Sequence, residues 1–161
     1  MTKKALIIID LQKGFINELT QDIPYKTKKY IEENQNDFDL VLFTQFINHS
    51  ESVFVKQLEY KDFMEQHEYD LVNEIKEFVG DENLFQKDTY GSFVDDEMLD
   101  ALRLEEIKEV YLGGIATENC VLTFARDAFD RSFKVKVIKD LCASPESIEL
   151  HNVALQIIEN N

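Results

Sequence analysis

Five short apolar runs recur along the chain, and most of them end in a polar or small residue. The run "ALIIID" (5–10) is continuous and closed by an acid, as expected of a strand that is covered on both faces. The same pattern returns in "DLVLFT" (39–44), "NLFQK" (83–87), "EVYLGG" (109–114) and "KVKVIKD" (134–140). The sequence therefore predicts five strands.

Helical spacing fills the intervals between these runs. It predicts helices over about 26–36, 95–103 and 118–131, a helical turn or two near 70–78, and a last helix that begins near "SPES" (144–147). Ser144 is the expected N-cap of that last helix, and Pro145 suits its first turn. Alternating strands and helices predict a three-layer α/β/α Rossmann-like fold with a mostly parallel sheet. The stretch 45–82 has few clear signals, and we expect a loop-rich excursion there.

The composition is that of one acidic globular domain spanning residues 1–161, with 44% hydrophobic residues. The 32 acidic residues outnumber the 17 basic ones, and the formal charge of −15 argues against nucleic acid or an anionic membrane as a partner. The first apolar run is short and ends at Asp10, so we expect no cleaved leader and no membrane span. A cytoplasmic protein with two reduced cysteines is the expectation.

The predicted strand ends collect polar residues. In a parallel sheet the carboxyl ends of the strands lie at one edge, which is where ligands usually bind. Asp10, Thr44, Lys87, Gly114 and Asp140 all fall at such ends. The sequence therefore favours an active site at that edge.

Cys120 follows the fourth predicted strand in "GGIATENCVLTFARDAF" (113–129). With Thr117 as N-cap, Cys120 lies in the first helical turn, where unpaired N–H groups and the helix dipole stabilise a thiolate. The same N–H groups can hold a developing oxyanion. A cysteine in a helix can also be a small buried hydrophobe. Spacing alone leaves both interpretations open.

Asp10 and Lys87 are each ambiguous when taken alone. A carboxylate partly removed from water suits proton transfer, but an acid after a first strand can also cap a loop. A lysine at the rim of a cleft can keep a carboxylate ionised and lower the pKa of a thiol, or it can be a solvated surface charge. Together with Cys120 they place three reactive groups at three strand ends, which strengthens the hypothesis of a catalytic site.

Three segments carry a family resemblance. "ALIIIDLQKGF", "KDTYGSF" and "GGIATENCV" resemble, in that order, the signature segments of the isochorismatase-like cysteine hydrolases, a superfamily that includes nicotinamidases, N-carbamoyl amidases and ureidoacrylate-type amidases. The resemblance runs from about residue 5 to residue 143. It implies five to six strands in the order 3-2-1-4-5(-6), and a homo-dimer or homo-tetramer.

The resemblance implies a catalytic triad of Asp10, Lys87 and Cys120. In that chemistry Cys120 forms a thioester with a small amide or carbamoyl substrate, Asp10 acts as the base, and Lys87 gives electrostatic support. The resemblance also implies a cis bond between Ile115 and Ala116, with the backbone amides of Ala116 and Cys120 as the oxyanion hole. Isochorismatases proper need no cysteine, so Cys120 favours the amidase branch.

The chain departs from the nicotinamidase pattern of metal ligands. Nicotinamidases carry an Asp-x-His pair after the second strand, plus a further histidine, but this stretch reads "TQFINHSES". Phe46 stands at the aspartate position and Asn48 at the histidine position. His49 is interpreted as a loop residue, and His67 and His151 as surface or packing residues. We therefore expect no metal and no cofactor.

Aromatic residues near the motifs predict the pocket. Phe15, Phe46 and Tyr90 are expected to form a wall for a small planar or apolar substrate, whereas Phe93 is assigned to packing. Three alternatives stay open: a non-catalytic ligand-binding or assembly protein on the same fold, a nicotinamidase with an atypical metal site, and a thiol redox protein that pairs Cys120 with Cys142.

Overall fold

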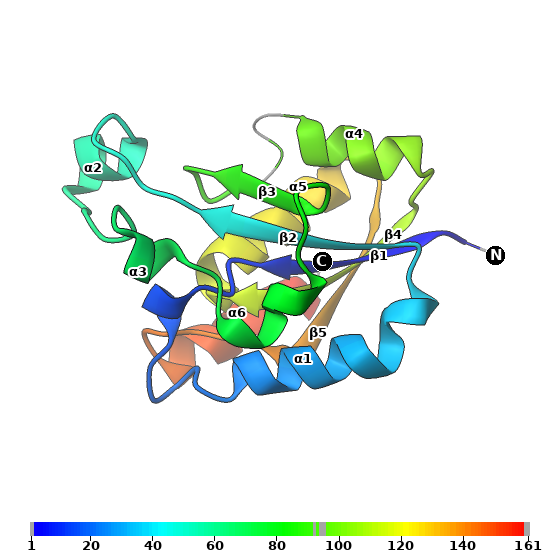
Figure 1. Ribbon diagram of the computed structural model, residues 1–161, viewed down its shortest axis with the longest axis horizontal. Helices are drawn as coiled ribbons and strands as arrows, with labels where there is room; N and C mark the ends of the chain where they lie inside the picture. The colour runs from blue at the N-terminus through cyan, green and yellow to red at the C-terminus, as the bar shows by residue number, and fades with distance from the viewer. Residues whose placement is uncertain (1, 92, 94–95, 160–161) are drawn as a thin grey trace.

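The structure is a computed structural model that describes residues 2–91, 93 and 96–159. One sheet runs through the molecule, and each pair of neighbouring strands in it is parallel (Figure 1). Its strands, in spatial order, are β3 (Leu84–Lys87), β2 (Leu40–Phe46), β1 (Lys4–Ile9), β4 (Glu109–Ile115) and β5 (Lys134–Ala143). The five predicted strands and their order 3-2-1-4-5 are confirmed. Within the described residues the sheet has no sixth strand.

Helices cover both faces of the sheet and give the predicted three layers. The α-helices are α1 (Ile23–Asn34), α2 (Val53–Leu58), α3 (Gln66–Tyr69), α4 (Glu97–Leu104), α5 (Leu122–Asp130) and α6 (Ile148–Glu159). Shorter helical turns are η1 (Lys13–Phe15), η2 (Gln35–Asp37), η3 (Asn73–Phe78) and η4 (Thr117–Val121). In Figure 1, α4 and α5 lie on one side of the sheet and α1 on the other, while α2 and α3 lie beyond the tips of β2 and β3. No helix among the described residues is long and apolar enough to cross a membrane.

The central strand β1 shows why the fold needs both helical layers. Ala5, Ile7 and Ile9 pack into a core cluster shared with α4 and α5, whereas Leu6 and Ile8 pack into a second cluster shared with α1. Side chains alternate between the two faces of a strand, so a continuous apolar run must be covered twice. The run "ALIIID" is therefore buried along its whole length.

Two helix boundaries differ from the prediction. Helix α1 begins at Ile23, three residues earlier than expected, because Pro24 occupies its first turn, where a missing N–H costs nothing. The last helix begins at Ile148, and Ser147 caps it by accepting a hydrogen bond from the backbone N–H of Leu150. Ser144 instead accepts from the N–H groups of Glu146 and Ser147 in the preceding turn, so its assignment as N-cap is wrong.

Three other predicted helical segments compare as follows with the structure. The turn or two predicted near 70–78 is the 3₁₀ helix η3, and the predicted segment 118–131 is split between η4 and α5. The predicted segment 95–103 corresponds to α4, with residue 95 outside the described residues.

The excursion 45–82 is held together by an aromatic cluster and by one buried amide. Phe46, Phe54 and Phe63 form a small core of their own, separate from the two clusters that flank the sheet. The Nδ2 group of Asn48 donates to the carbonyl oxygens of Tyr60 and Asp62, at 2.9 and 3.0 Å. The excursion thus contains α2, α3 and η3 and is more ordered than the sequence indicated.

The carboxyl ends of the strands lie slightly further along the chain than predicted. Strand β2 continues to Phe46 and β5 to Ala143, so Thr44 and Asp140 lie within strands and not at their ends. Gly114 lies near the end of β4 with φ of 134°, and a Cβ atom there would lie 2.0 Å from the carbonyl oxygen of Ile9. Only glycine permits this close approach of β4 to the end of β1.

Candidate active site

The structure brings Asp10, Lys87 and Cys120 into one buried group. The Nζ atom of Lys87 lies 2.8 Å from Oδ2 of Asp10 and 3.5 Å from Sγ of Cys120. Asp10 follows β1, Lys87 ends β3, and Cys120 lies in η4, directly after β4. The parallel strands carry these three residues to the same edge of the sheet, and all three are buried.

Asp10 is fixed by its backbone and by Thr44. Its φ of 48° lies in the left-handed region, which is uncommon for residues other than glycine and recurs at active sites. The hydroxyl of Thr44 donates to Oδ1 of Asp10 at 2.6 Å and accepts from the backbone N–H of Asp10 at 3.1 Å. Sequence reasoning placed Thr44 near the site but gave it no role. Its place on the strand beside β1 was the available signal.

The side-chain ammonium of Lys87 is surrounded by hydrogen-bond acceptors. Besides Asp10 and Cys120, it donates to the carbonyl oxygens of Thr89 and Tyr90, at 2.8 and 3.2 Å. Burial acts to lower the pKa of Lys87, but the interactions of its ammonium group with Asp10 and Cys120 outweigh it and leave the pKa raised. Lys87 is therefore a permanent positive charge in the site and not a proton donor.

Cys120 lies in a π-helical turn, and its local environment differs from the predicted one. Ala116, and not Thr117, precedes the first helical residue, and the Thr117 hydroxyl contacts Nδ1 of His151 at 2.8 Å instead. Burial and the charge of Asp10 raise the pKa of Cys120, and Lys87 only partly opposes them. This direction favours the thiol form of Cys120, whereas its predicted place in a first helical turn favoured the thiolate. A base must take the proton when the thiol reacts.

A cavity of about 320 Å³ opens beside Cys120. Its wall contains Cys120, Ala116, Phe15, Phe46 and Tyr90. The three aromatic residues that the sequence assigned to the pocket therefore lie around the same space as the thiol. The peptide bond between Ile115 and Ala116 is cis, as the family resemblance implies.

Six further residues complete the wall, and sequence reasoning missed them. They are Phe54, Leu58, Tyr60, Asn119, Pro145 and Glu146. Three of these come from the excursion 45–82, where neither period nor motif gave a signal. Phe93, by contrast, is buried against Phe124 and Phe133, as the sequence predicted.

The residues at the nicotinamidase metal position do not fit a metal ion. Phe46 presents a phenyl ring there, and the Asn48 amide is occupied by backbone carbonyls and by the hydroxyl of Ser52. His49 is half exposed and pairs with Asp88 at 2.8 Å. Within the described part of the chain, no three His, Cys, Asp or Glu side chains are placed to hold a metal.

The remaining histidines and the second cysteine lie away from the chemistry. His67 is exposed on α3, and His151 on α6 packs against η4 through Thr117. Burial lowers the pKa of His151, which favours its neutral form. Cys142 is free and buried in the core, where burial raises its pKa to about 12. Neither cysteine forms a disulfide.

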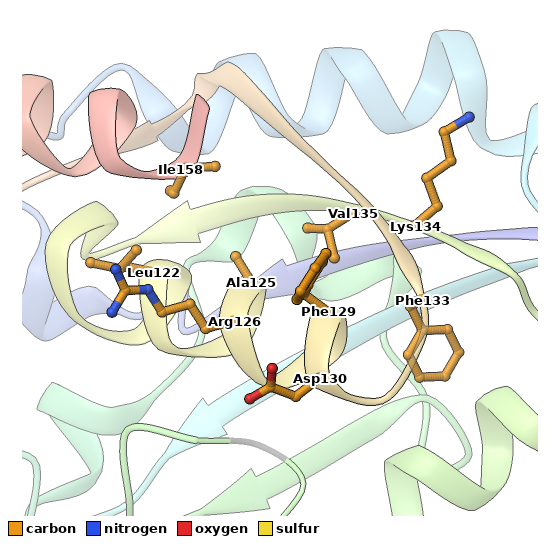
Figure 2. A pocket seen from close by; sticks show the side chains of 9 residues that line it. All are labelled: Leu122, Ala125, Arg126, Phe129, Asp130, Phe133, Lys134, Val135 and Ile158. Atoms are coloured by element: carbon orange, nitrogen blue, oxygen red, sulfur yellow. The ribbon is translucent and has the colours of Figure 1, made fainter. Parts of the chain in front are cut away.

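A second, larger cavity of about 550 Å³ is lined by residues of a different kind. It lies along α5 and the start of β5, with Ile158 of α6 on its other side (Figure 2). Leu122, Ala125, Phe129 and Val135 form much of its wall, and its charged residues are Arg126, Asp130 and Lys134. No nucleophilic thiol or buried acid–lysine pair lies among its lining residues. The smaller cavity at Cys120 is the candidate active site.

The family comparison agrees with this geometry. The family model described as "Isochorismatase domain" matches residues 4–161. The chain belongs to the isochorismatase family. It is a hydrolase of the isochorismatase type, and the family membership leaves its reaction open.

Several relatives share the fold over nearly the whole chain. The uncharacterized isochorismatase family protein YaaI of Bacillus subtilis (strain 168) is 24% identical over 168 residues, covering 98% of this chain and 89% of YaaI. A pyrazinamidase/nicotinamidase from Streptococcus mutans UA159 superposes with a TM-score of 0.84 at 24% identity, covering 98% of this chain and 96% of that one. An N-carbamoylsarcosine amidase from Thermoplasma acidophilum superposes with a TM-score of 0.82 at 19% identity, covering 98% and 94%. The two solved structures have different enzyme names, so likeness of fold alone does not identify the substrate of this chain.

Proposed function

We propose that this protein is a metal-independent cysteine hydrolase that cleaves a C–N bond in a small amide or carbamoyl compound. One observation carries the proposal: the Lys87 ammonium contacts both the Asp10 carboxylate and the Cys120 thiol, and Cys120 lines a cavity. A nucleophile, a base and a fixed cation within hydrogen-bond reach of one another are the parts that covalent acyl transfer requires.

The first step is attack by Cys120 with Asp10 as the base. Because the pKa of Cys120 is raised, the proton leaves as the sulfur attacks, and it passes to the Asp10 carboxylate. A bond forms between Sγ and the carbonyl carbon, and the carbonyl oxygen takes the negative charge. The backbone N–H groups of Ala116 and Cys120 are the proposed donors to that oxygen.

Collapse of the intermediate breaks the C–N bond. Asp10 returns its proton to the leaving amine, and a thioester to Cys120 remains. Water then attacks the thioester carbonyl and gives a proton to Asp10, which passes it back to the sulfur as the C–S bond breaks. The acid and the amine leave, and the enzyme is restored. Lys87 keeps its proton throughout, since its pKa is raised.

The proposal does not depend on a metal because Phe46 and Asn48 leave no ligand set at the nicotinamidase position. In place of a bound ion, the cavity offers aromatic surface. A nicotinamidase with an atypical metal site therefore has no supporting group of residues in the described chain.

A panel of small amides and carbamoyl compounds tests the proposal. Amine or ammonia release is measured for the wild-type enzyme, for Cys120→Ala, and for Cys142→Ala as a matched control for loss of a buried thiol. We expect hydrolysis of at least one compound by the wild type and by Cys142→Ala, and none by Cys120→Ala. Turnover by Cys120→Ala would refute the mechanism, and binding without any turnover would favour the non-catalytic alternative.

A further inference from the structure

The wall of the cavity beside Cys120 contains five aromatic rings that come from several elements of the chain. Phe15 lies in η1, Phe46 ends β2, Phe54 lies in α2, Tyr60 follows α2, and Tyr90 follows β3. Five segments thus converge on one small space. Aromatic side chains are common in the walls of ligand pockets, so the arrangement of these rings and the charge near them must indicate the kind of ligand.

Phe54 organises these rings. Its ring centroid lies 4.9 Å from that of Phe46 and 4.8 Å from that of Tyr90, with interplanar angles of 67° and 71°. Tyr60 lies 6.1 Å from Phe54 at an angle of 55°. Rings that meet edge to face are inclined to one another, so they form an angular box and not a flat stack. A slot for a flat substrate would require parallel rings on its two sides.

The charge at this box is negative. Glu146, at the approach to α6, is the one charged side chain among the residues that line the cavity. The pKa of Tyr60 is raised, first by burial and then by the negative charges of Asp62, Glu68 and Glu146. Lys87 is not among the residues that line the cavity, although its ammonium lies 5.8 Å from the centroid of the Phe46 ring, and it already contacts Asp10 and two carbonyl oxygens. An anionic substrate group would meet repulsion here, and a cation would meet attraction.

We propose that this aromatic box and Glu146 select substrates that carry an alkylammonium group a few atoms away from the scissile amide. Aromatic faces attract quaternary and alkylated ammonium groups through the ring quadrupole, and a carboxylate at the rim adds a direct charge. The cation lies among Phe54, Tyr60 and Tyr90, and the amide carbonyl lies at Cys120. The hydrolysis step rests on the proposed function, but the binding of the cation does not.

An isosteric pair of amides tests the selection. Trimethylammonioacetamide and 3,3-dimethylbutanamide have nearly the same shape and differ in a positively charged nitrogen and a neutral carbon. Succinamate supplies an anion of similar length. We expect kcat/KM to be about tenfold higher for the cation than for the neutral amide, in keeping with cation–π attraction in a partly dry site. Succinamate is expected to be the poorest of the three.

Two variants separate the charge from the rings. Glu146→Gln should reduce the preference for the cation about threefold, whereas Glu149→Gln, which removes a nearby exposed carboxylate outside the cavity, should leave it unchanged. Phe54→Leu keeps an apolar side chain but removes a ring face, and should lower kcat/KM for the cation more than for the neutral amide. Equal or greater activity on the neutral or the anionic amide would overturn the proposal. So would a preference that neither variant alters.

Binding to Cys120→Ala distinguishes this inference from the proposed reaction. Calorimetry with trimethylammonioacetamide and this variant should show binding that 3,3-dimethylbutanamide does not match. If the cation binds but no amide is hydrolysed by the wild type, the proposed reaction is refuted and the preference for an alkylammonium group is supported. If amides are hydrolysed but the cation binds no better than its neutral isostere, the preference for an alkylammonium group is refuted and the proposed reaction is supported.

Discussion

Two ion-pair clusters occupy opposite edges of the same sheet. At the edge where the strands end (the carboxyl edge), Lys87 lies 2.8 Å from Asp10, and both side chains are almost completely buried. At the edge where the strands begin (the amino edge), Glu109 of β4 lies 3.1 Å from Lys134 and 3.0 Å from Lys136, and both lysine side chains are exposed. The distances are nearly the same. The surroundings differ, because one pair is removed from water and the other is not.

The comparison teaches that burial, and not distance, makes an ion pair chemically useful. The two lysines lower the pKa of Glu109, first Lys136 and then Lys134, but water screens the cluster, and its neighbour is the Tyr111 hydroxyl and not a thiol. At the edge where the strands end, the low dielectric strengthens the interactions between charges, so Asp10 and Lys87 act strongly on the adjacent thiol.

The largest expected difference concerns activity. Replacing Asp10 by Asn removes the proposed base and should lower kcat by about 10³-fold, within the range for loss of general acid–base catalysis. Glu109→Gln removes a carboxylate with comparable ion-pair distances and should leave kcat unchanged. Steady-state kinetics on one substrate from the amide panel measures both. An Asp10→Asn enzyme with wild-type kcat would remove Asp10 from the mechanism.

A second difference concerns stability. Asp10→Asn leaves the Lys87 ammonium buried without its counter-ion, and the free energy of unfolding should fall by about 3–5 kcal/mol. The double variant Asp10→Asn with Lys87→Met removes both charges and should regain part of that loss. Urea unfolding of the two proteins, with Glu109→Gln as the exposed control, measures the effect. A double variant less stable than Asp10→Asn would show that the buried charge is not the cause.

A third difference concerns the reactivity of the thiol. Asp10 is the proposed base for the Cys120 proton, so Asp10→Asn should slow alkylation of Cys120 by iodoacetamide near pH 7 as well as turnover. Lys87→Met should also slow alkylation, because Lys87 opposes the upward shift in the pKa of Cys120. Glu109→Gln should change nothing. Alkylation of Asp10→Asn as fast as that of the wild type, or faster, would mean that the carboxylate acts on the thiol mainly through its charge and not as its base.

How far the sequence predicts this site depends on which residues carry a local signal. Asp10, Lys87 and Cys120 were predictable because each follows an apolar run, and parallel topology brings such positions together. The five strands followed from the same runs. The state of Cys120 was not predictable, since it depends on burial and on a charge more than one hundred residues away in the chain.

The residues that line the cavity, by contrast, could not all be predicted from the sequence. Phe54 and Tyr60 lie in a segment with no apolar period, and their position depends on contacts such as those of Asn48 with two distant carbonyl groups. The side chain of Gln12 gives a further example, since it bonds both backbone groups of Phe46 and so orients the end of β2. Such long-range hydrogen bonds leave no pattern in the sequence. They emerge only when the chain is folded.

The smallest expected difference is a pH dependence at the amino edge. Because the folded-state pKa of Glu109 lies below its ordinary value of 4.5, the carboxylate stabilises the fold above that pH, and the contribution is lost as the pH falls through the lowered value. Urea midpoints of wild type and Glu109→Gln should therefore differ slightly at pH 7 and converge below pH 4.5. A gap that widens on acidification would contradict the ion-pair assignment.

The nucleophilic role of Cys120 is tested most directly by rapid-quench mass spectrometry during turnover. The wild-type enzyme, mixed with a hydrolysed amide and quenched in acid, should gain the mass of the acyl group, and peptide mapping should place that group on Cys120. Asp10→Asn should accumulate the adduct far more slowly, and Cys120→Ala should show none. Sustained turnover by the wild type with no adduct, together with retained turnover by Cys120→Ala, would contradict the account.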